Sequence, residues 1–143
     1  MEVLENLLNL EDKNKALVKD FYKAFNARDY DEIAKYYISD YNYNGTVQVE
    51  GPEGGVAMVK KFVGAFDMKI TILDLLAEKD KVMVFAQGDG QHLGEFNGIQ
   101  PSRKKISIRA MIIYRIERNQ IAEMWEIAEE LNLLKQPGVV ASK

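Results

Sequence analysis

Hydrophobic side chains in the first part of the chain recur with the spacing of an α-helix. Leu17, Phe21 and Phe25 lie four residues apart, and lysines such as Lys19 fall between them. Positions four apart share one face of a helix, so apolar and charged side chains separate onto opposite faces. The pattern predicts an amphipathic helix over residues 12–27, with its apolar face in the core.

The segments on either side of this helix also have helical patterns. Residues 1–10 carry apolar side chains at helical spacing, and this face needs cover from the domain or from a partner. Asp29 has the character of an N-cap, and Glu32, three residues later, completes a capping box. We therefore predict a short second helix that ends at Tyr37.

The next segment changes its pattern twice. Residues 41–50 alternate between apolar and polar positions and are rich in residues that favour strands, so they predict one strand or two short ones. Residues 51–55 contain three glycines and a proline, which predicts a loop. Apolar residues at helical spacing over 56–66 predict a third helix.

From Met68 onward the period of the apolar positions is two, which is typical of strands. The predicted strands cover residues 69–77, 81–91, 105–117 and 120–129, with a loop at 93–102. Helices followed by an antiparallel meander indicate the α+β class. A twisted sheet that curls around the three helices would leave a cavity between the two layers.

Length and charge narrow the range of partners. The 143 residues are expected to form one domain over 1–143, with an ordinary 47% of apolar and 29% of charged residues. The net charge of −3 argues against a duplex nucleic-acid partner, which requires a basic surface. The basic run Arg103–Lys105 is interpreted as the start of a strand.

Several kinds of site and location are excluded or disfavoured. The chain has no cysteine and one histidine, so disulfides, cysteine zinc sites and multi-histidine metal sites are excluded. No apolar run is long enough to span a membrane. The N-terminus lacks the features of a signal peptide, so we expect a cytoplasmic location.

Five stretches together resemble the SnoaL-like polyketide cyclase family, within the nuclear-transport-factor-2-like superfamily. They are FYKAFNARDYDEI (21–33), ISDYNYN (38–44), GQHLGEFNGIQP (90–101), SIRAMIIYRI (107–116) and IAEMWEIAEELNLLKQ (121–136). The GxHxGxxxGxxP spacing of the third stretch is the most specific. The resemblance covers about Asn14 to Gln136 and leaves residues 1–11 as an extension and 137–143 as a tail.

The resemblance implies a fold and a chemistry. The expected fold is a cone-shaped barrel, in which a curved, mainly antiparallel sheet packs on three N-terminal helices around a pocket. Family members usually dimerise through the sheet. Their cyclases close a ring in a polyketide by intramolecular aldol condensation, using an acidic residue and no cofactor.

The last predicted strand contains the leading catalytic candidate. Alternation places Glu126 on a face that is otherwise small and apolar, where a carboxylate could serve as a general acid or base. The position of the family's catalytic aspartate also falls on Glu126. The alternative is a glutamate at the rim or in an ion pair. The face that carries Glu126 consists of Ala122, Met124, Glu126 and Ala128. The opposite face consists of Ile121, Glu123, Trp125, Ile127 and Glu129.

Four more polar or aromatic residues are candidates for the pocket. His92 matches a histidine of the family near the cavity mouth and could hold a substrate oxygen or shuttle a proton, although a loop histidine is also often solvated. Tyr43 and Asn44 match polar pocket positions of the family, and Tyr43 could donate a hydrogen bond to an enolate oxygen, unless its ring only packs. Phe96, in the same loop as His92, is a further candidate for ligand contact.

The sequence departs from the family at two pocket positions. Ile112 and Met124 are apolar where many members have ionisable residues. The pocket is therefore more hydrophobic than in those members and lacks an obvious second group to stabilise an enolate. One hypothesis is therefore a cofactor-free cyclase or isomerase that binds a small apolar carbonyl compound. The alternative is a non-catalytic protein that binds a small hydrophobic ligand in the same fold.

Three further interpretations concern Arg109, Trp125 and the remaining aromatic residues. Hydrolysis of an epoxide would need an Asp-Arg-Asp relay, and the available Arg109 lies off the face of Ile112 by alternation. Trp125, on the face opposite Glu126, is expected to pack in a homodimer interface. Other aromatic residues are assigned to the core because of their helical spacing: Tyr22, Phe25, Tyr37, Phe62 and Phe66.

Overall fold

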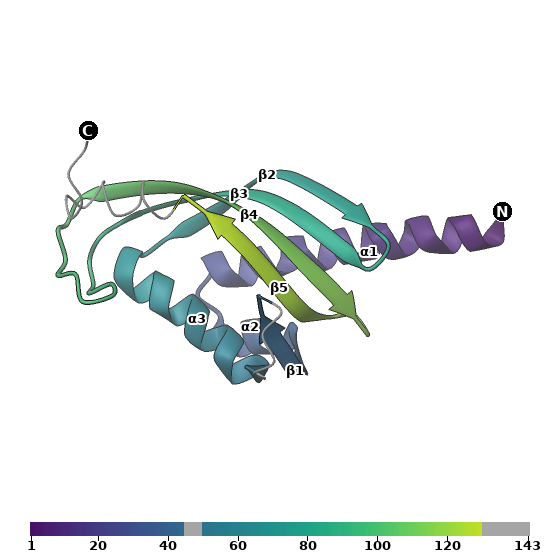
Figure 1. The fold of residues 1–143 in the computed structure, drawn as a ribbon, viewed down its shortest axis with the longest axis horizontal. Helices are drawn as coiled ribbons and strands as arrows, with labels where there is room; N and C mark the ends of the chain where they lie inside the picture. Colours follow the sequence, from purple (N-terminus) through teal and green to yellow (C-terminus); the bar gives the residue numbers. More distant parts are fainter. Residues whose placement is uncertain (45–49, 130–143) are drawn as a thin grey trace.

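The protein is an α+β fold in which three helices pack under a curved five-stranded sheet (Figure 1). The structure is a computed structural model, which describes residues 1–44 and 50–129. This architecture confirms the predicted fold class. The elements are α1 (Glu2–Asn26), α2 (Tyr30–Lys35), β1 (Tyr37–Tyr43), α3 (Gly51–Phe66), β2 (Lys69–Glu78), β3 (Lys81–Gln91), β4 (Lys105–Glu117) and β5 (Gln120–Ala128).

The sheet has the strand order β1-β5-β4-β3-β2. Strands β2 to β5 form the predicted antiparallel meander, in which each strand pairs with the next one along the chain. The first strand, β1, joins the opposite edge and runs parallel to β5. The end of β1 therefore lies beside the strand that carries Glu126.

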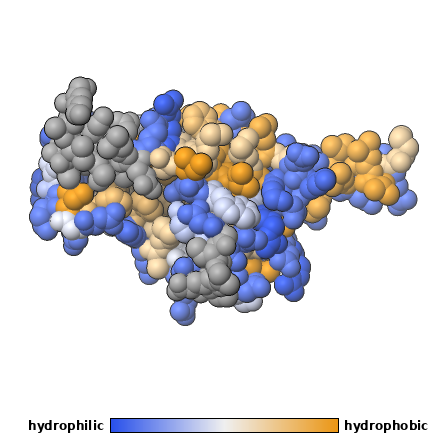
Figure 2. Space-filling view, viewed as in Figure 1, coloured by the Kyte–Doolittle hydropathy of each residue, from blue (hydrophilic) through white to orange (hydrophobic). Residues whose placement is uncertain are grey.

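Helix α1 is longer than the predicted helix, because it begins at Glu2 and includes the N-terminal segment. From Asn14 onward its apolar face is buried in the main core. Its N-terminal end extends beyond the sheet, where the same face is uncovered (Figures 1 and 2). The exposed apolar side chains of this end are Val3, Leu4, Leu8 and Leu10.

The boundary between α2 and β1 differs from the prediction. The Asp29 side chain accepts a hydrogen bond from the backbone N–H of Glu32, which confirms the N-cap. The helix ends at Lys35, however, and Tyr37 begins the strand that was predicted to start at residue 41. Tyr37 pairs with Ile121 of β5, so pairing with a distant strand overrides the helical spacing.

The predicted loop at residues 51–55 is wrong, because these residues form the first turns of α3. Gly51 turns the chain with φ of +64°, and Pro52 sits in the first turn, where its missing N–H is harmless. Gly55 has a packing reason: a Cβ there would lie 2.6 Å from the ring of Tyr37. Glycine at this position lets α3 approach β1 closely.

One residue of β5 lies on a different face than alternation predicts. Ile121 was placed on the outer face, but it is completely buried. The reason is a β-bulge: Arg115 pairs with Glu123 while the next residue, Ile116, pairs with Ile121, so Ala122 is the extra residue. Beyond the bulge the predicted alternation holds.

Candidate functional site

The inner face of β5 places Glu126 among apolar neighbours. Glu126 lies opposite Ile112 of β4, and Met124 lies opposite Tyr114. Side chains of directly opposite residues share one face of a sheet. The structure therefore brings together three of the predicted site residues: Glu126, Ile112 and Met124.

The end of β1 adds two more of the predicted site residues. Tyr43 pairs with Met124, and its ring packs against the main core. The Asn44 side-chain Oδ1 accepts a hydrogen bond of 3.3 Å from the backbone N–H of Glu126. The Asn44 N–H in turn donates to the carbonyl of Met124, at 2.6 Å. These bonds attach the end of β1 to the part of β5 that holds the carboxylate.

The inner face is less covered around Glu126 than elsewhere. Ile112 and Ala122 are buried, whereas Glu126, Ala110 and Ala128 are only half-buried. The main core ends here, and a second cluster of buried residues from α3, β4 and the following loops begins. A carboxylate between two apolar clusters, and still partly accessible, is the arrangement that a general base requires.

Four buried tyrosines surround this part of the core, and sequence reasoning did not connect them with the site. They are Tyr22 of α1, Tyr37 and Tyr41 of β1, and Tyr114 of β4, and we call them the tyrosine cluster. Burial raises the pKa of all four phenols, and the charge of Glu126 contributes to the rise in each. Tyr22 and Tyr37 were predicted as core residues, which is confirmed, but their closeness to Glu126 is a tertiary property.

Phe96 packs against the second cluster of buried residues, and the buried His92 contacts Phe66 of that cluster. The His92 ring packs against Phe66, with 5.3 Å between ring centres, and Phe96 packs against the same ring at 4.9 Å. The His92 Nδ1 accepts a hydrogen bond from the backbone N–H of Ser102 at 3.1 Å, so a neutral ring carries its proton on Nε2. That nitrogen is buried and has no hydrogen-bond partner among the residues that the structure describes.

Strand register separates His92 from Glu126. Glu126 aligns through Ile112 with Val84 of β3, while the backbone N–H of His92 continues the ladder to Lys104 beyond the end of β3. Residues 84 and 92 are eight steps apart, about 26 Å along a straight strand. The bend of the sheet shortens this distance (Figure 1), but a ligand that touched both groups would have to be elongated.

The other carboxylates of the last strand region face away from this site. Glu123 forms an ion pair with Arg115 at 2.6 Å, and Glu129 forms one with Arg109 at 2.7 Å. Both arginines belong to the outer face of β4. Strand alternation therefore distinguishes Glu126 correctly, and Arg109 lies off the inner face as the sequence predicted.

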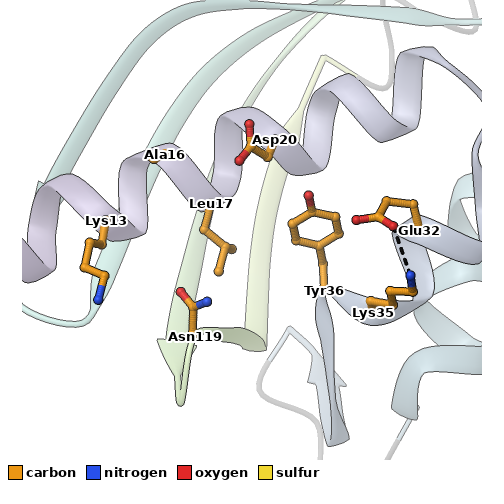
Figure 3. A pocket seen from close by; sticks show the side chains of 8 residues that line it. All are labelled: Lys13, Ala16, Leu17, Asp20, Glu32, Lys35, Tyr36 and Asn119. Carbon is orange, nitrogen blue, oxygen red and sulfur yellow. Dashed lines mark hydrogen bonds and ion pairs between the residues drawn. The ribbon is translucent and has the colours of Figure 1, made fainter.

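Three surface hollows are lined by described residues, and neither Glu126 nor His92 lines any of them. The first, of about 420 Å³, lies between α1, α2 and the β4–β5 turn (Figure 3). Its lining includes Lys13, Asp20 and an ion pair between Lys35 and Glu32. The predicted inner cavity is thus not one of these three hollows.

Within residues 1–44 and 50–129, no three histidine or carboxylate side chains gather as a possible metal site. No helix in this part of the chain is long and apolar enough to cross a membrane.

Comparison with known proteins links this geometry to a family. Among solved structures, the fold resembles TsrD from Streptomyces laurentii, with a TM-score of 0.82 and 25% identity over 90% of this chain and 97% of that one. It also resembles IdmH from Streptomyces antibioticus, with a TM-score of 0.75 and 23% identity over 88% of this chain and 99% of that one. A third similar structure is a SnoaL-like polyketide cyclase from Agrobacterium tumefaciens. Its TM-score is 0.75, and it is 15% identical over 85% of this chain and 95% of that one.

Sequence comparison is more specific about the family. None of the curated proteins is significantly similar to the chain. The model of the SnoaL-like polyketide cyclase family, however, matches residues 16–137, which is most of the sequence. The chain therefore belongs to the SnoaL-like polyketide cyclase family.

Proposed function

We propose that the protein catalyses a cofactor-free aldol cyclisation or isomerisation of an apolar carbonyl compound, with Glu126 as the general base. The carboxylate would remove a proton from the carbon next to a carbonyl group. The observation that carries this proposal is the placement of Glu126 on the partly open inner face, opposite Ile112. The apolar neighbours suit a hydrophobic substrate, and desolvation strengthens a base in such surroundings.

We assign supporting roles to the other candidates. Tyr43 and Asn44, at the end of β1, lie on the strand beside Glu126 and would position the reacting oxygen, with Ile112 and Met124 as the apolar wall. His92 would act at the far end of the substrate. Its buried Nε2 proton lacks an acceptor in the described chain, and a ligand oxygen would satisfy it. Phe96 would cover the apolar part of the ligand there.

The test replaces one carboxylate oxygen of the proposed base with an amide nitrogen. Glu126→Gln removes the basic oxygen and keeps the shape, and Glu123→Gln, on the outer face of the same strand, is the matched control. With a panel of poly-β-carbonyl compounds, we expect Glu126→Gln to lower turnover about 10²- to 10⁴-fold, the usual contribution of a general base. Unchanged turnover in Glu126→Gln would remove this mechanism.

A second candidate function is the binding of a small hydrophobic ligand without chemistry. The apolar pair Ile112 and Met124, beside the single carboxylate, favours it. Native mass spectrometry of protein purified from cells would then detect a retained apolar ligand. Finding no retained ligand, and no binder in a lipophilic compound library, would contradict this function.

We also propose a homodimer that forms through the outer face of the sheet. Two adjacent rows of residues on β2 to β5 are apolar except for one acid, and charged or polar rows flank them. Figure 2 shows apolar atoms gathered over the strands. We call these rows the outer band: Leu76, Met83, Ile113 and Trp125 in one, and Asp74, Phe85, Met111 and Ile127 in the other.

The outer band has the properties of a contact surface. Ile127, Leu76 and Met111 are between 49% and 80% exposed, which is unusual for large apolar side chains that lie next to each other. Part of the outer band forms a hollow of about 180 Å³, which could receive side chains from a second copy of the chain. The family resemblance of the sequence also implies a dimer through the sheet, and the proposed interface agrees with that expectation.

A further inference from the structure

The side chain of Tyr41, in β1, ends in a hydroxyl group next to Met124 of β5. This hydroxyl donates a hydrogen bond to the thioether sulfur of Met124, with 3.7 Å between the two atoms. Tyr41 is only 2% exposed, and its ring packs against that of Tyr37, with 4.6 Å between the ring centres. The ring is thus held in place, and its hydroxyl has a defined position.

The acceptor of this hydrogen bond is a weak one. A phenolic hydroxyl is a good donor, whereas a thioether sulfur is only a weak acceptor. Elsewhere in the tyrosine cluster, the hydroxyls of Tyr22 and Tyr114 are bonded to each other, oxygen to oxygen. The hydroxyl of Tyr41 therefore has a donor capacity that an oxygen atom would use better than the sulfur does.

This donor lies beside the proposed base. Met124 and Glu126 are two residues apart on the inner face of β5, and both are only half-buried. A ligand at the carboxylate therefore also meets the side chain that covers the Tyr41 hydroxyl. Burial raises the pKa of Tyr41, and nearby charges, that of Glu126 among them, add to the rise. The phenol thus keeps its proton and remains a donor at neutral pH.

Met124 can give way to the oxygen atom of a ligand. Methionine has three rotatable side-chain bonds and adapts to changed neighbours more easily than branched residues do. A hydrogen bond to a negatively charged oxygen is roughly twice as strong as one between neutral groups. The exchange of sulfur for oxygen is therefore most favourable when the ligand oxygen becomes an anion.

We propose that Tyr41 is a catalytic residue whose hydroxyl leaves the sulfur of Met124 and donates a hydrogen bond to the enolate oxygen of the substrate, an inference that rests on the proposed function. As Glu126 takes the proton from the α-carbon, the C–H electron pair forms a C=C bond and the carbonyl π pair moves onto the oxygen. Tyr41 keeps its own proton and stabilises the negative oxygen. It thereby supplies the second group that the apolar Ile112 and Met124 do not provide, while Tyr43 keeps its positioning role.

Infrared spectroscopy of a bound ketone tests this hydrogen bond without any turnover. The probe is 2-tetralone with ¹³C at its carbonyl carbon, because a donor at the carbonyl oxygen lowers the frequency of the C=O stretch. We expect a lowered frequency in the wild type and a smaller lowering in Tyr41→Phe. Tyr36→Phe, in the surface hollow of Figure 3, is the matched control and should give the wild-type frequency.

Deuterium exchange at the α-carbon of the same ketone measures the effect on the reaction. We expect Tyr41→Phe to lower kcat about 10²-fold, the usual effect of removing one donor to an oxyanion, with little change in KM. A merely structural role would lower the melting temperature and leave both kcat and the carbonyl frequency unchanged. If Glu126 is not the base, Glu126→Gln exchanges as fast as the wild type, while the carbonyl frequency still reports on Tyr41. The two failures are therefore distinguishable.

Two infrared results would overturn the inference. One is the same carbonyl frequency in the wild type and in folded Tyr41→Phe, and the other is a wild type that does not lower the frequency of the ketone at all. If Tyr41→Phe does not fold, 3-fluorotyrosine at position 41 takes its place, because it keeps the hydroxyl and makes it a stronger donor. The carbonyl frequency then falls further than in the wild type, and an unchanged frequency would contradict the inference as well.

Discussion

At the scale of single residues, the tyrosine cluster makes folding stability depend on alkaline pH. Burial keeps the pKa of its phenols above the ordinary value of about 10, while the same phenols in the unfolded chain ionise near that value. Below pH 9 the phenols are protonated in both the folded and the unfolded state, so their contribution to folding stability does not change with pH. Above pH 10 the unfolded state loses protons first, so each phenol lowers stability by about 1.4 kcal/mol per pH unit.

Urea unfolding between pH 8 and pH 11 measures this loss. The double variant Tyr22→Phe/Tyr114→Phe removes two of the phenols, so its stability should fall less steeply with pH than that of the wild type. Other groups that titrate in this range are common to both proteins and cancel in the comparison. Equal slopes in the two proteins would mean that these phenols do not hold their protons in the folded state.

What the sequence could predict at this scale depended on local periodicity. Alternation separated Glu126 from Glu123 without any structure. It failed at Ile121, because a β-bulge is not visible as a period. The contact between Tyr22 and Tyr114 joins residues 92 positions apart, and the helical spacing of Tyr22 predicted only that it would be buried.

At the scale of elements, Gly55 lets α3 pack closely against β1. A Cβ at this position would lie 2.6 Å from the ring of Tyr37, too close for any real contact. We expect Gly55→Ala to lower the free energy of unfolding by about 1–3 kcal/mol, the usual cost of overpacking, despite the better helix propensity of alanine. Chemical denaturation of the variant measures this change.

Gly64, on the same helix, is the matched control. A Cβ there would meet nothing within 4 Å. Gly64→Ala should therefore stabilise the protein by up to about 1 kcal/mol, because alanine is the better helix former. If both alanine variants were stabilised alike, the close approach of α3 to Tyr37 would not limit the packing.

Elements defined by local signals were predicted well. The bounds of β3 and β4 agree with the sequence prediction, because tight turns and a period of two mark them. The beginnings of β1 and α3 were not predicted. Both depend on distant partners: Tyr37 pairs with Ile121 of β5, and it also fills the space that Gly55 leaves.

At the scale of the whole molecule, the outer band predicts a dimer. Ile113→Lys places a charge in the middle of this band, so we expect the protein to become monomeric. Thr71→Lys, on the exposed outer side of β2 and outside the band, should leave the dimer intact. Light scattering at micromolar concentration measures the molar mass of the wild type and of both variants. A monomeric wild type would refute the dimer.

The arrangement of the whole site was only partly predictable. Alternation in the sequence grouped Glu126 with Ile112 and Met124, and the family resemblance added Tyr43, Asn44 and His92. The structure brings the first five of these residues together on β4, β5 and the end of β1. Register along β3 separates His92 from this group, and no periodicity in the sequence reveals that distance.

The central claim is that Glu126 removes a proton from the carbon next to a carbonyl group. Solvent-deuterium exchange at the α-carbon of apolar ketones, followed by proton NMR, measures this step without knowledge of the natural substrate. We predict that the wild type and Glu123→Gln accelerate exchange equally, while Glu126→Gln is slower by about 10²-fold or more. Equal exchange by wild type and Glu126→Gln, or no exchange by a wild type that binds the ketone, would contradict the claim.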